Sequence, residues 1–97
     1  MVERDDENAE ALRLDANAVA GDLEAWFGVD VTDQDGQCGH CGNVAPMGTL
    51  LAYTHGPGTV LRCSQCLGVV LRVVTTPVGM YLDAQGAAWM SRPAAVR

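Results

Sequence analysis

Two pairs of cysteines, each with two residues between its members, constrain the fold of this chain more than any other feature. The pairs are Cys38–Cys41 and Cys63–Cys66, and they use all four cysteines of the 97-residue sequence. Two intervening residues let one tight turn direct both sulfurs at a single ion, and two such turns supply the four thiolates of a structural zinc site. We therefore predict one structural Zn²⁺ ion, with no open coordination position, bound by Cys38, Cys41, Cys63 and Cys66.

The residues that follow the two pairs differ. Gly42 comes directly after the first pair and supplies the permissive backbone that such a turn usually requires. In the second pair this position is Leu67, and glycine comes one place later, at Gly68. We expect the second turn to be less regular than the first. The histidines, His40 inside the first turn and His55 distant from both, are expected to be solvated loop residues rather than ligands.

The sequence between the two pairs has the pattern of a β-hairpin. The β-type runs 49–54 and 59–63 flank His55-Gly-Pro-Gly58, which has strong turn chemistry. A hairpin here would return the chain toward its start, so the two cysteine pairs would meet at one end of a sheet. Further β-type segments follow at residues 69–76, 80–82 and 87–90.

An amphipathic helix is expected over residues 15–28. Asp15 or Asn17 is expected to serve as its N-cap, and Gly28 is a natural C-terminal stop. After the helix, residues 32–36 are expected to form a polar turn. The apolar stripe of the helix has the spacing i, i+4, i+7, i+8 and consists of Val19, Leu23, Trp26 and Phe27.

The segment 69–76 has two faces, because side chains alternate along a strand. One face is expected to carry Val69, Leu71 and Val73, and the other Val70, Arg72 and Val74. We expect the helix to cover the first face, because a thin sheet needs a cover to bury its apolar side. The second face is then the expected contact surface for a partner.

These elements predict a small metal-stabilised β fold, a zinc ribbon of antiparallel hairpins with one N-terminal amphipathic helix. We expect residues 1–13 to be an acidic disordered arm, residues 14–90 a single domain, and residues 91–97 a tail. Zinc in such sites contributes about 10–16 kcal/mol of folding free energy, comparable to or larger than the net stability of a domain. The metal-free chain is therefore not expected to hold this shape.

Charge is distributed unevenly along the chain. Residues 1–35 carry eleven acidic residues against two arginines, whereas residues 36–97 carry one acidic residue against four arginines, and there is no lysine. Nucleic-acid-binding proteins normally present a dense basic surface, which this sequence lacks. It also lacks an apolar run near the roughly 20 residues that span a bilayer and a signal-peptide pattern. We expect a cytoplasmic protein, where four cysteines indicate metal more than disulfides.

Two C-x₂-C pairs joined by a hairpin resemble the zinc-ribbon superfamily over about residues 36–76. The resemblance implies a bound metal and a ribbon fold, and implies little about function, because ribbons serve transcription, translation, enzymes and adaptors alike. The wider sequence is also similar to a family of short actinobacterial proteins of unknown function. This second similarity implies no activity, and it rests on residues 14–17, 21–27 and 56–63.

The cysteine pattern leaves three chemical alternatives open. A rubredoxin-like iron site uses the same four ligands, but usually has glycine after both pairs and aromatic residues over the metal, so Leu67 argues against it. Two disulfides would require an exported protein. A thioredoxin-type redox pair would require a helix N-terminus after a strand. The sequence shows no recognisable Ser–His–Asp set or pair of catalytic carboxylates, so we do not expect an enzyme.

We expect the function to be non-catalytic binding to a protein, as an accessory subunit of a larger enzyme complex. The apolar residues of the helix and of segment 69–76 exceed what one thin sheet can bury, which favours an interface. The main alternative is nucleic-acid binding through Arg62, Arg72 and the loop 55–58, and an iron electron carrier is the second. The sequence leaves the identity of the partner and the oligomeric state open.

Overall fold

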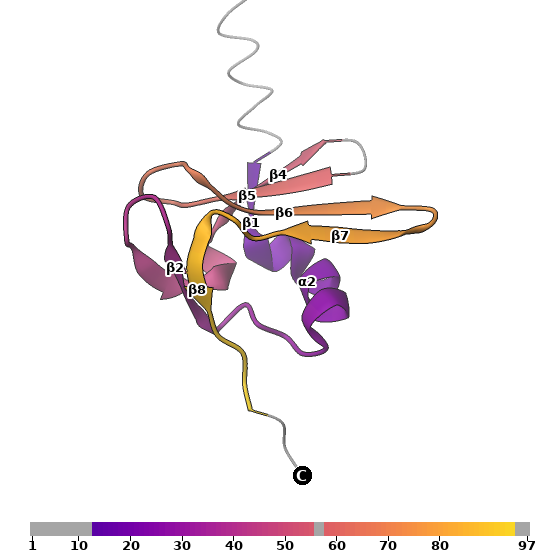
Figure 1. Cartoon of the computed structure of the whole chain (residues 1–97), viewed down its shortest axis with the longest axis horizontal. Coiled ribbons are helices and arrows are strands. Elements are labelled where there is room, and N and C mark those ends of the chain that lie inside the picture. The colour runs from indigo at the N-terminus through magenta and orange to yellow at the C-terminus, as the bar shows by residue number, and fades with distance from the viewer. Residues whose placement is uncertain (1–12, 56–57, 95–97) are drawn as a thin grey trace, which may run out of the picture.

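A computed structural model describes residues 13–55 and 58–94, and this part of the chain forms two antiparallel sheets and one α-helix (Figure 1). The larger sheet has the strand order β1-β4-β5-β6-β7, with β1 at Arg13–Asp15, β4 at Leu51–His55, β5 at Gly58–Arg62, β6 at Val69–Thr76 and β7 at Gly79–Asp83. The smaller sheet has the order β3-β2-β8, with β2 at Asp35–Cys38, β3 at Val44–Pro46 and β8 at Ala87–Met90. The predicted small, β-rich antiparallel architecture is confirmed.

The hairpin predicted between the two cysteine pairs is present as β4 and β5. Thr54 pairs with Thr59 and Leu51 pairs with Arg62, so the strands are in register along their whole length. The start differs from the prediction, because Met47–Thr49 form a short 3₁₀ helix before β4. The segments predicted at 69–76 and 87–90 are β6 and β8 with the same bounds.

The expected polar turn over residues 32–36 is wrong at its end, where Asp35 and Gly36 begin β2. This strand pairs with β3 on one side and with β8 on the other. The backbone groups of a polar, glycine-containing segment are satisfied here by two partner strands, one of which lies about fifty residues further along the chain. The first cysteine pair therefore has its own hairpin and its own small sheet.

The helix is shorter than predicted, and its predicted N-cap is wrong. The 3₁₀ helix Ala16–Val19 precedes α2, which runs from Ala20 to Phe27. Asp15 pairs with Leu51 as the last residue of β1, and Val19 precedes α2 without a capping side chain. Pairing with the edge of β4 thus overrides the local capping preference of Asp15. The predicted stop is confirmed, because Gly28 has a left-handed backbone with φ of 78°.

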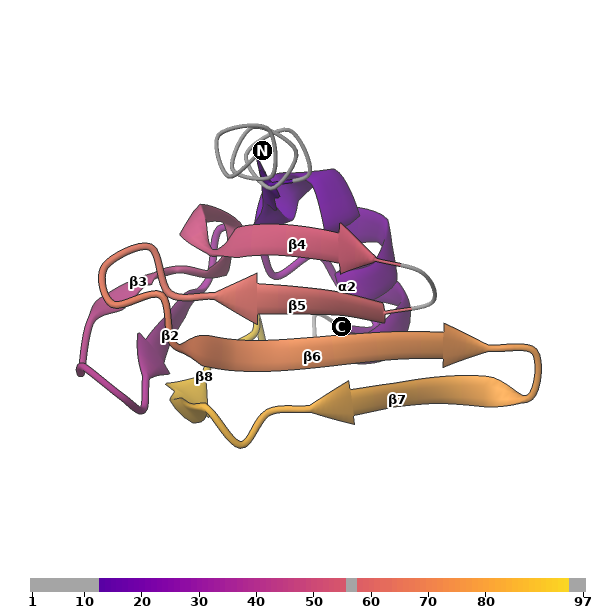
Figure 2. The same cartoon turned by 90° about the horizontal axis from the view of Figure 1, so that it is seen from above.

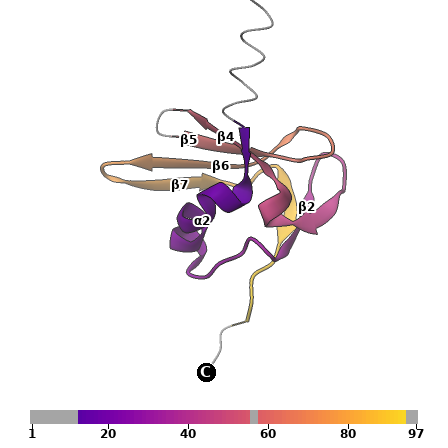
Figure 3. The same ribbon diagram turned by 180° about the vertical axis from the view of Figure 1, so that it is seen from behind.

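Helix α2 covers one face of the larger sheet (Figures 1 and 3), and the core lies between them and the smaller sheet. Leu23 is the buried residue of α2, and Val19 and Phe27 pack at the margin of the core. Trp26 was expected in the buried stripe but is 41% exposed. The largest fully buried side chains are those of Leu23, Leu61, Leu71, Val31 and Cys63. No helix in the described ranges is long and apolar enough to cross a membrane.

The predicted alternation of side chains in β6 fails at Val70. Leu61 of β5 pairs with Leu71, but the next residue, Arg62, pairs with Val69, so Val70 is an extra residue in β6. Such a β-bulge interrupts the two-residue period of the strand. Val70 is consequently buried beside Leu71, with an exposure of 5%. The expected contact face of Val70, Arg72 and Val74 therefore loses its first member.

Candidate metal centre

The two cysteine pairs meet where the turn after β2 lies against the turn after β5. All four sulfur atoms lie within 4.8 Å of one another. The Sγ atoms of Cys38 and Cys66 are 3.7 Å apart, as are those of Cys41 and Cys63. Four sulfurs at about 2.3 Å from one ion in tetrahedral geometry lie about 3.8 Å apart, whereas a disulfide requires about 2.05 Å. Two of the sulfur–sulfur distances match the tetrahedral spacing and none exceeds 4.8 Å, so these four cysteines could hold one metal ion.

The turns of the two pairs are built by the same set of backbone hydrogen bonds. In the first turn, the N–H of Gly42 donates to the carbonyl of Cys38 and the N–H of His40 donates to the Cys38 sulfur, at 2.9 and 3.3 Å. In the second, the N–H of Leu67 donates to the carbonyl of Cys63 and the N–H of Gln65 to the Cys63 sulfur, at the same two distances. The expectation of a less regular second turn is therefore wrong.

Leu67 makes this regularity possible by adopting a backbone that leucine normally avoids. Its φ is 63°, close to the 80° of Gly42 at the equivalent position. The conformation is held by a hydrogen bond in which Nη1 of Arg62 donates to the Leu67 carbonyl at 2.8 Å. A residue other than glycine can thus fill this position, so the absence of glycine at 67 does not separate a zinc site from an iron site.

Leu67→Gly is expected to stabilise the protein. The left-handed conformation costs a residue with a side chain about 1–2 kcal/mol. Glycine avoids this cost, but it loses more conformational freedom on folding, which offsets part of the gain. We expect a net gain of about 0.5–1 kcal/mol, measured by thermal unfolding of the metal-bound protein. Gly42→Leu is the reverse substitution at the equivalent position of the first turn, and it is expected to destabilise the protein. A variant at 67 that is less stable than the wild type would show that the half-exposed leucine side chain matters more than its backbone strain.

His40 is exposed, as the sequence suggested, and its ring also links the two turns. Its Nε2 lies 2.9 Å from the carbonyl oxygen of Val69, directly after the second turn. The ring also lies against Gly68, where an added Cβ would be only 2.5 Å from the His40 Cδ2. The signal for this contact was the glycine displaced to position 68, which leaves room for the imidazole.

The loop between β7 and β8 is fixed against the first turn at a glycine. The N–H of Gly39 donates to the carbonyl of Gly86 at 2.8 Å. An added Cβ on Gly86 would collide with the carbonyl oxygen of Val69, and it would lie 2.9 Å from the Cα of Val70. The first cysteine turn, the start of β6 and the β7–β8 loop therefore converge at Gly86. These segments are distant in the chain, so the local sequence pattern does not predict that they meet here.

A protein family described as a family of unknown function, DUF6510, matches residues 6–95. The chain belongs to this family. No curated protein and no solved structure matches this chain. The matched segment includes the four cysteines, both sheets and α2, so the whole arrangement described above lies within the DUF6510 region.

Cys41 and Cys63 of this DUF6510 chain differ in their tendency to ionise. Burial opposes the thiolate of Cys63, but the backbone N–H groups of Cys66 and Gln65 and the neighbouring thiols outweigh it and lower the Cys63 pKa to about 7. For Cys41 the N–H of Asn43 favours the thiolate, yet desolvation and the other three cysteines together raise its pKa to about 12. Four anionic sulfurs this close repel one another, and a bound cation removes that repulsion.

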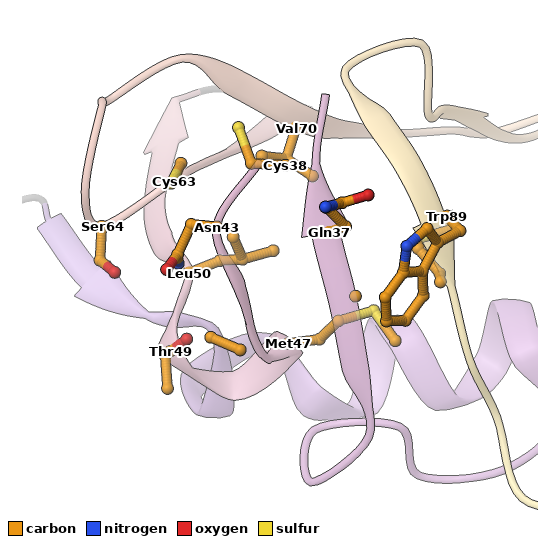
Figure 4. A pocket seen from close by; sticks show the side chains of 13 residues that line it. Gln37, Cys38, Asn43, Met47, Thr49, Leu50, Cys63, Ser64, Val70 and Trp89 are labelled. Carbon is orange, nitrogen blue, oxygen red and sulfur yellow. The ribbon is translucent and has the colours of Figure 1, made fainter. Parts of the chain in front are cut away.

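A narrow cavity lies between the two sheets beside the sulfurs (Figure 4). Cys38, Cys63 and Val70 line it on the side of the metal centre, and Met47 and Trp89 line it elsewhere. Its volume is about 20 Å³, which accommodates about one water molecule. The cavity adjoins the four cysteines of this DUF6510 chain, which could hold a metal ion.

Proposed function

We propose that this DUF6510 protein is a non-catalytic zinc ribbon, in which the metal stabilises a surface that binds another protein. The observation that carries the proposal is the four-sulfur cluster, with all sulfurs within 4.8 Å of one another and backbone N–H groups directed at Cys38 and Cys63. Four thiolates satisfy zinc completely and leave no position for water or substrate. A structural role for the ion follows from this chemistry.

The metal part of the proposal predicts about one zinc ion per chain in protein purified from its native host. Elemental analysis measures this directly, and Cys41→Ser provides the matched control because it removes one ligand from an exposed position. Iron as the native metal, visible as a red protein, would replace the structural role by electron transfer. A metal-free protein that is folded would end the zinc-ribbon proposal.

The binding surface that we propose is the open face of the larger sheet, the face opposite α2 (Figure 2). We define it by the outward-facing residues of β4, β5, β6 and β7. These residues line two adjoining hollows with Arg72 and Val74 at their shared boundary, and they are Tyr53, Val60, Arg62, Arg72, Val74 and Tyr81. Aromatic, aliphatic and arginine side chains together are typical of the energetic centres of protein interfaces.

The two arginines of the open face differ in their contacts within the chain. Arg62 lies 5.7 Å from the centre of the Tyr53 ring and donates to the Leu67 carbonyl, so it is held in place. Arg72 is exposed, and its cross-strand neighbours are Val60 and Asp83. An exposed guanidinium with valine on one side can bind a carboxylate of a partner bidentately, in competition with Asp83 on its other side, while apolar surface is covered around it. We therefore propose a protein partner that presents acidic and apolar side chains together.

Arg72→Glu is expected to abolish partner binding and to keep the fold, since the second carboxylate that it places opposite Asp83 costs about 1 kcal/mol or less on this exposed face. The change reverses one exposed charge at the centre of the open face, and Arg92→Glu makes the same charge change at an exposed position after β8. Affinity purification from the native host should recover a protein with the wild type and with Arg92→Glu but not with Arg72→Glu. The recovered protein should then bind the purified wild type directly. Equal recovery by all three baits would remove the open face from the proposal.

Nucleic acid is the second candidate, because Tyr53 and Tyr81 share the open face with Arg62 and Arg72, and bases stack on such aromatic side chains. Binding through several arginines weakens steeply as salt rises, whereas an apolar protein interface responds little. Titration of labelled single-stranded DNA and RNA at low salt separates the two. Micromolar binding that Arg62→Ala and Arg72→Ala abolish would overturn the protein-binding proposal.

A further inference from the structure

Strand β7 is the last strand of the larger sheet, and within residues 13–55 and 58–94 no strand pairs with its outer side. An edge strand presents backbone N–H and C=O groups that can pair with another strand, and natural edges are commonly guarded by lysine, proline or a bulge. β7 has the sequence Gly-Met-Tyr-Leu-Asp, and its pairing with β6 runs without interruption from Gly79 to Asp83. The strand thus contains no lysine, proline or bulge, and its one charged residue is Asp83 at its end.

We propose that β7 pairs with β7 of a second copy of this chain, so that two five-stranded sheets join into one. The pairing is antiparallel and centred on Tyr81, which lies opposite Tyr81 of the second copy. Met80 then lies opposite Leu82, and Gly79 opposite Asp83, of the second copy. This register uses all five residues of the strand, whereas any other centre shortens the ladder.

The side chains of β7 fit this register on both faces of the sheet. Tyr81 is 62% exposed on the open face, where the paired tyrosines would cover each other. Met80 and Leu82 lie on the other face, at the margin of the core, and their pairing would extend that core across the twofold axis. Asp83 faces glycine rather than a second carboxylate, so no like charges lie opposite each other. A register centred on Asp83 would instead oppose two carboxylates.

The charge of the chain sets how this association depends on salt. Each copy carries a net charge of −6, so two copies repel each other at low ionic strength. Salt screens this repulsion but leaves backbone hydrogen bonds and apolar contacts largely intact. We therefore expect dimerisation to strengthen with salt, the opposite of an interface held by ion pairs. A five-residue ladder is small beside the roughly 1,200–2,000 Å² of stable complexes, so the dimer should depend on protein concentration.

Sedimentation equilibrium of the zinc-loaded full chain, from micromolar to millimolar concentration, tests the proposal. Tyr81→Lys and Tyr81→Glu are each expected to weaken the dimer at least tenfold, because each places like charges directly opposite each other. An equimolar mixture of the two variants should regain a dimer, since lysine then faces glutamate. Val44→Lys is the matched control at an exposed site on the smaller sheet and should leave association unchanged.

The rescue in the mixture also shows that both Tyr81 variants are folded. In the wild type, amide hydrogen exchange of Met80 and Leu82 should slow as protein concentration rises, which requires no variant. A chain that stays monomeric at millimolar concentration overturns the proposal, and so does a dimer that both Tyr81 variants retain. Tyr81 belongs to the open face as well, but neither result decides the proposed function, because zinc content and partner binding through Arg72 are measured separately.

Discussion

Cys63→Ser is expected to unfold the protein at neutral pH. Cys63 belongs to the four-cysteine cluster, and with an exposure of 1% it is also part of the hydrophobic core. Zinc binding at such sites contributes about 10–16 kcal/mol, and small domains have net stabilities of about 5–15 kcal/mol. Loss of one thiolate weakens the binding of the ion enough to remove most of that stability. The serine hydroxyl, which is buried in the core without a partner, destabilises the fold further.

Circular dichroism and thermal unfolding measure this effect, and a strong chelator added to the wild type should reproduce it. Ser64→Ala is the matched control, because it changes the exposed neighbouring residue and keeps the Gln65 N–H that donates to the Cys63 sulfur. A Cys63→Ser variant that melts within a few degrees of the wild type would show that the two sheets are stable without metal.

Gly86→Ala is expected to destabilise the protein by about 3 kcal/mol or more and to weaken its affinity for zinc. The added methyl group would collide with the Val69 carbonyl oxygen and lie within 2.9 Å of the Val70 Cα. These are backbone atoms of β6, which cannot rotate away as a side chain would. The loop must move instead, and its carbonyl then withdraws from the N–H of Gly39 beside the first two cysteines. A single methyl group thus disturbs both the packing of the two sheets and the metal centre.

Gly21→Ala is the control for this prediction, because an added Cβ there meets no atom within 4 Å. Gly21 lies within α2, where alanine is favoured over glycine by about 1 kcal/mol. The midpoint of urea unfolding should therefore rise for Gly21→Ala and fall for Gly86→Ala. In a zinc competition assay, only Gly86→Ala should lower the affinity for zinc. A variant at 86 that is as stable as the wild type would mean that the β7–β8 loop adjusts without cost.

Local spacing in the sequence was enough to predict the cysteine cluster and much of the larger sheet. Two residues between cysteines fix the geometry of a turn whatever surrounds it, and His55-Gly-Pro-Gly58 between two β-type runs fixes a hairpin. Together they bring the four sulfurs within 4.8 Å of one another. The stop at Gly28 and the bounds of β6 and β8 followed for the same reason, because each depends on residues that are neighbours in the chain.

Contacts between distant segments determined the remaining features. Asp15 ends β1 instead of capping the helix, because the backbone groups of β1 pair with β4. Polar residues form β2 because β3 and β8 pair with its backbone groups on both sides. The extra residue at Val70 moved that side chain from the expected open face into the core. Backbone pairing and steric fit at Gly86 and Gly68 depend on which segments meet in space. The sequence by itself therefore determined where a metal can bind and where the chain turns, whereas the tertiary structure decided which strands pair, which side chains are buried and which face remains open.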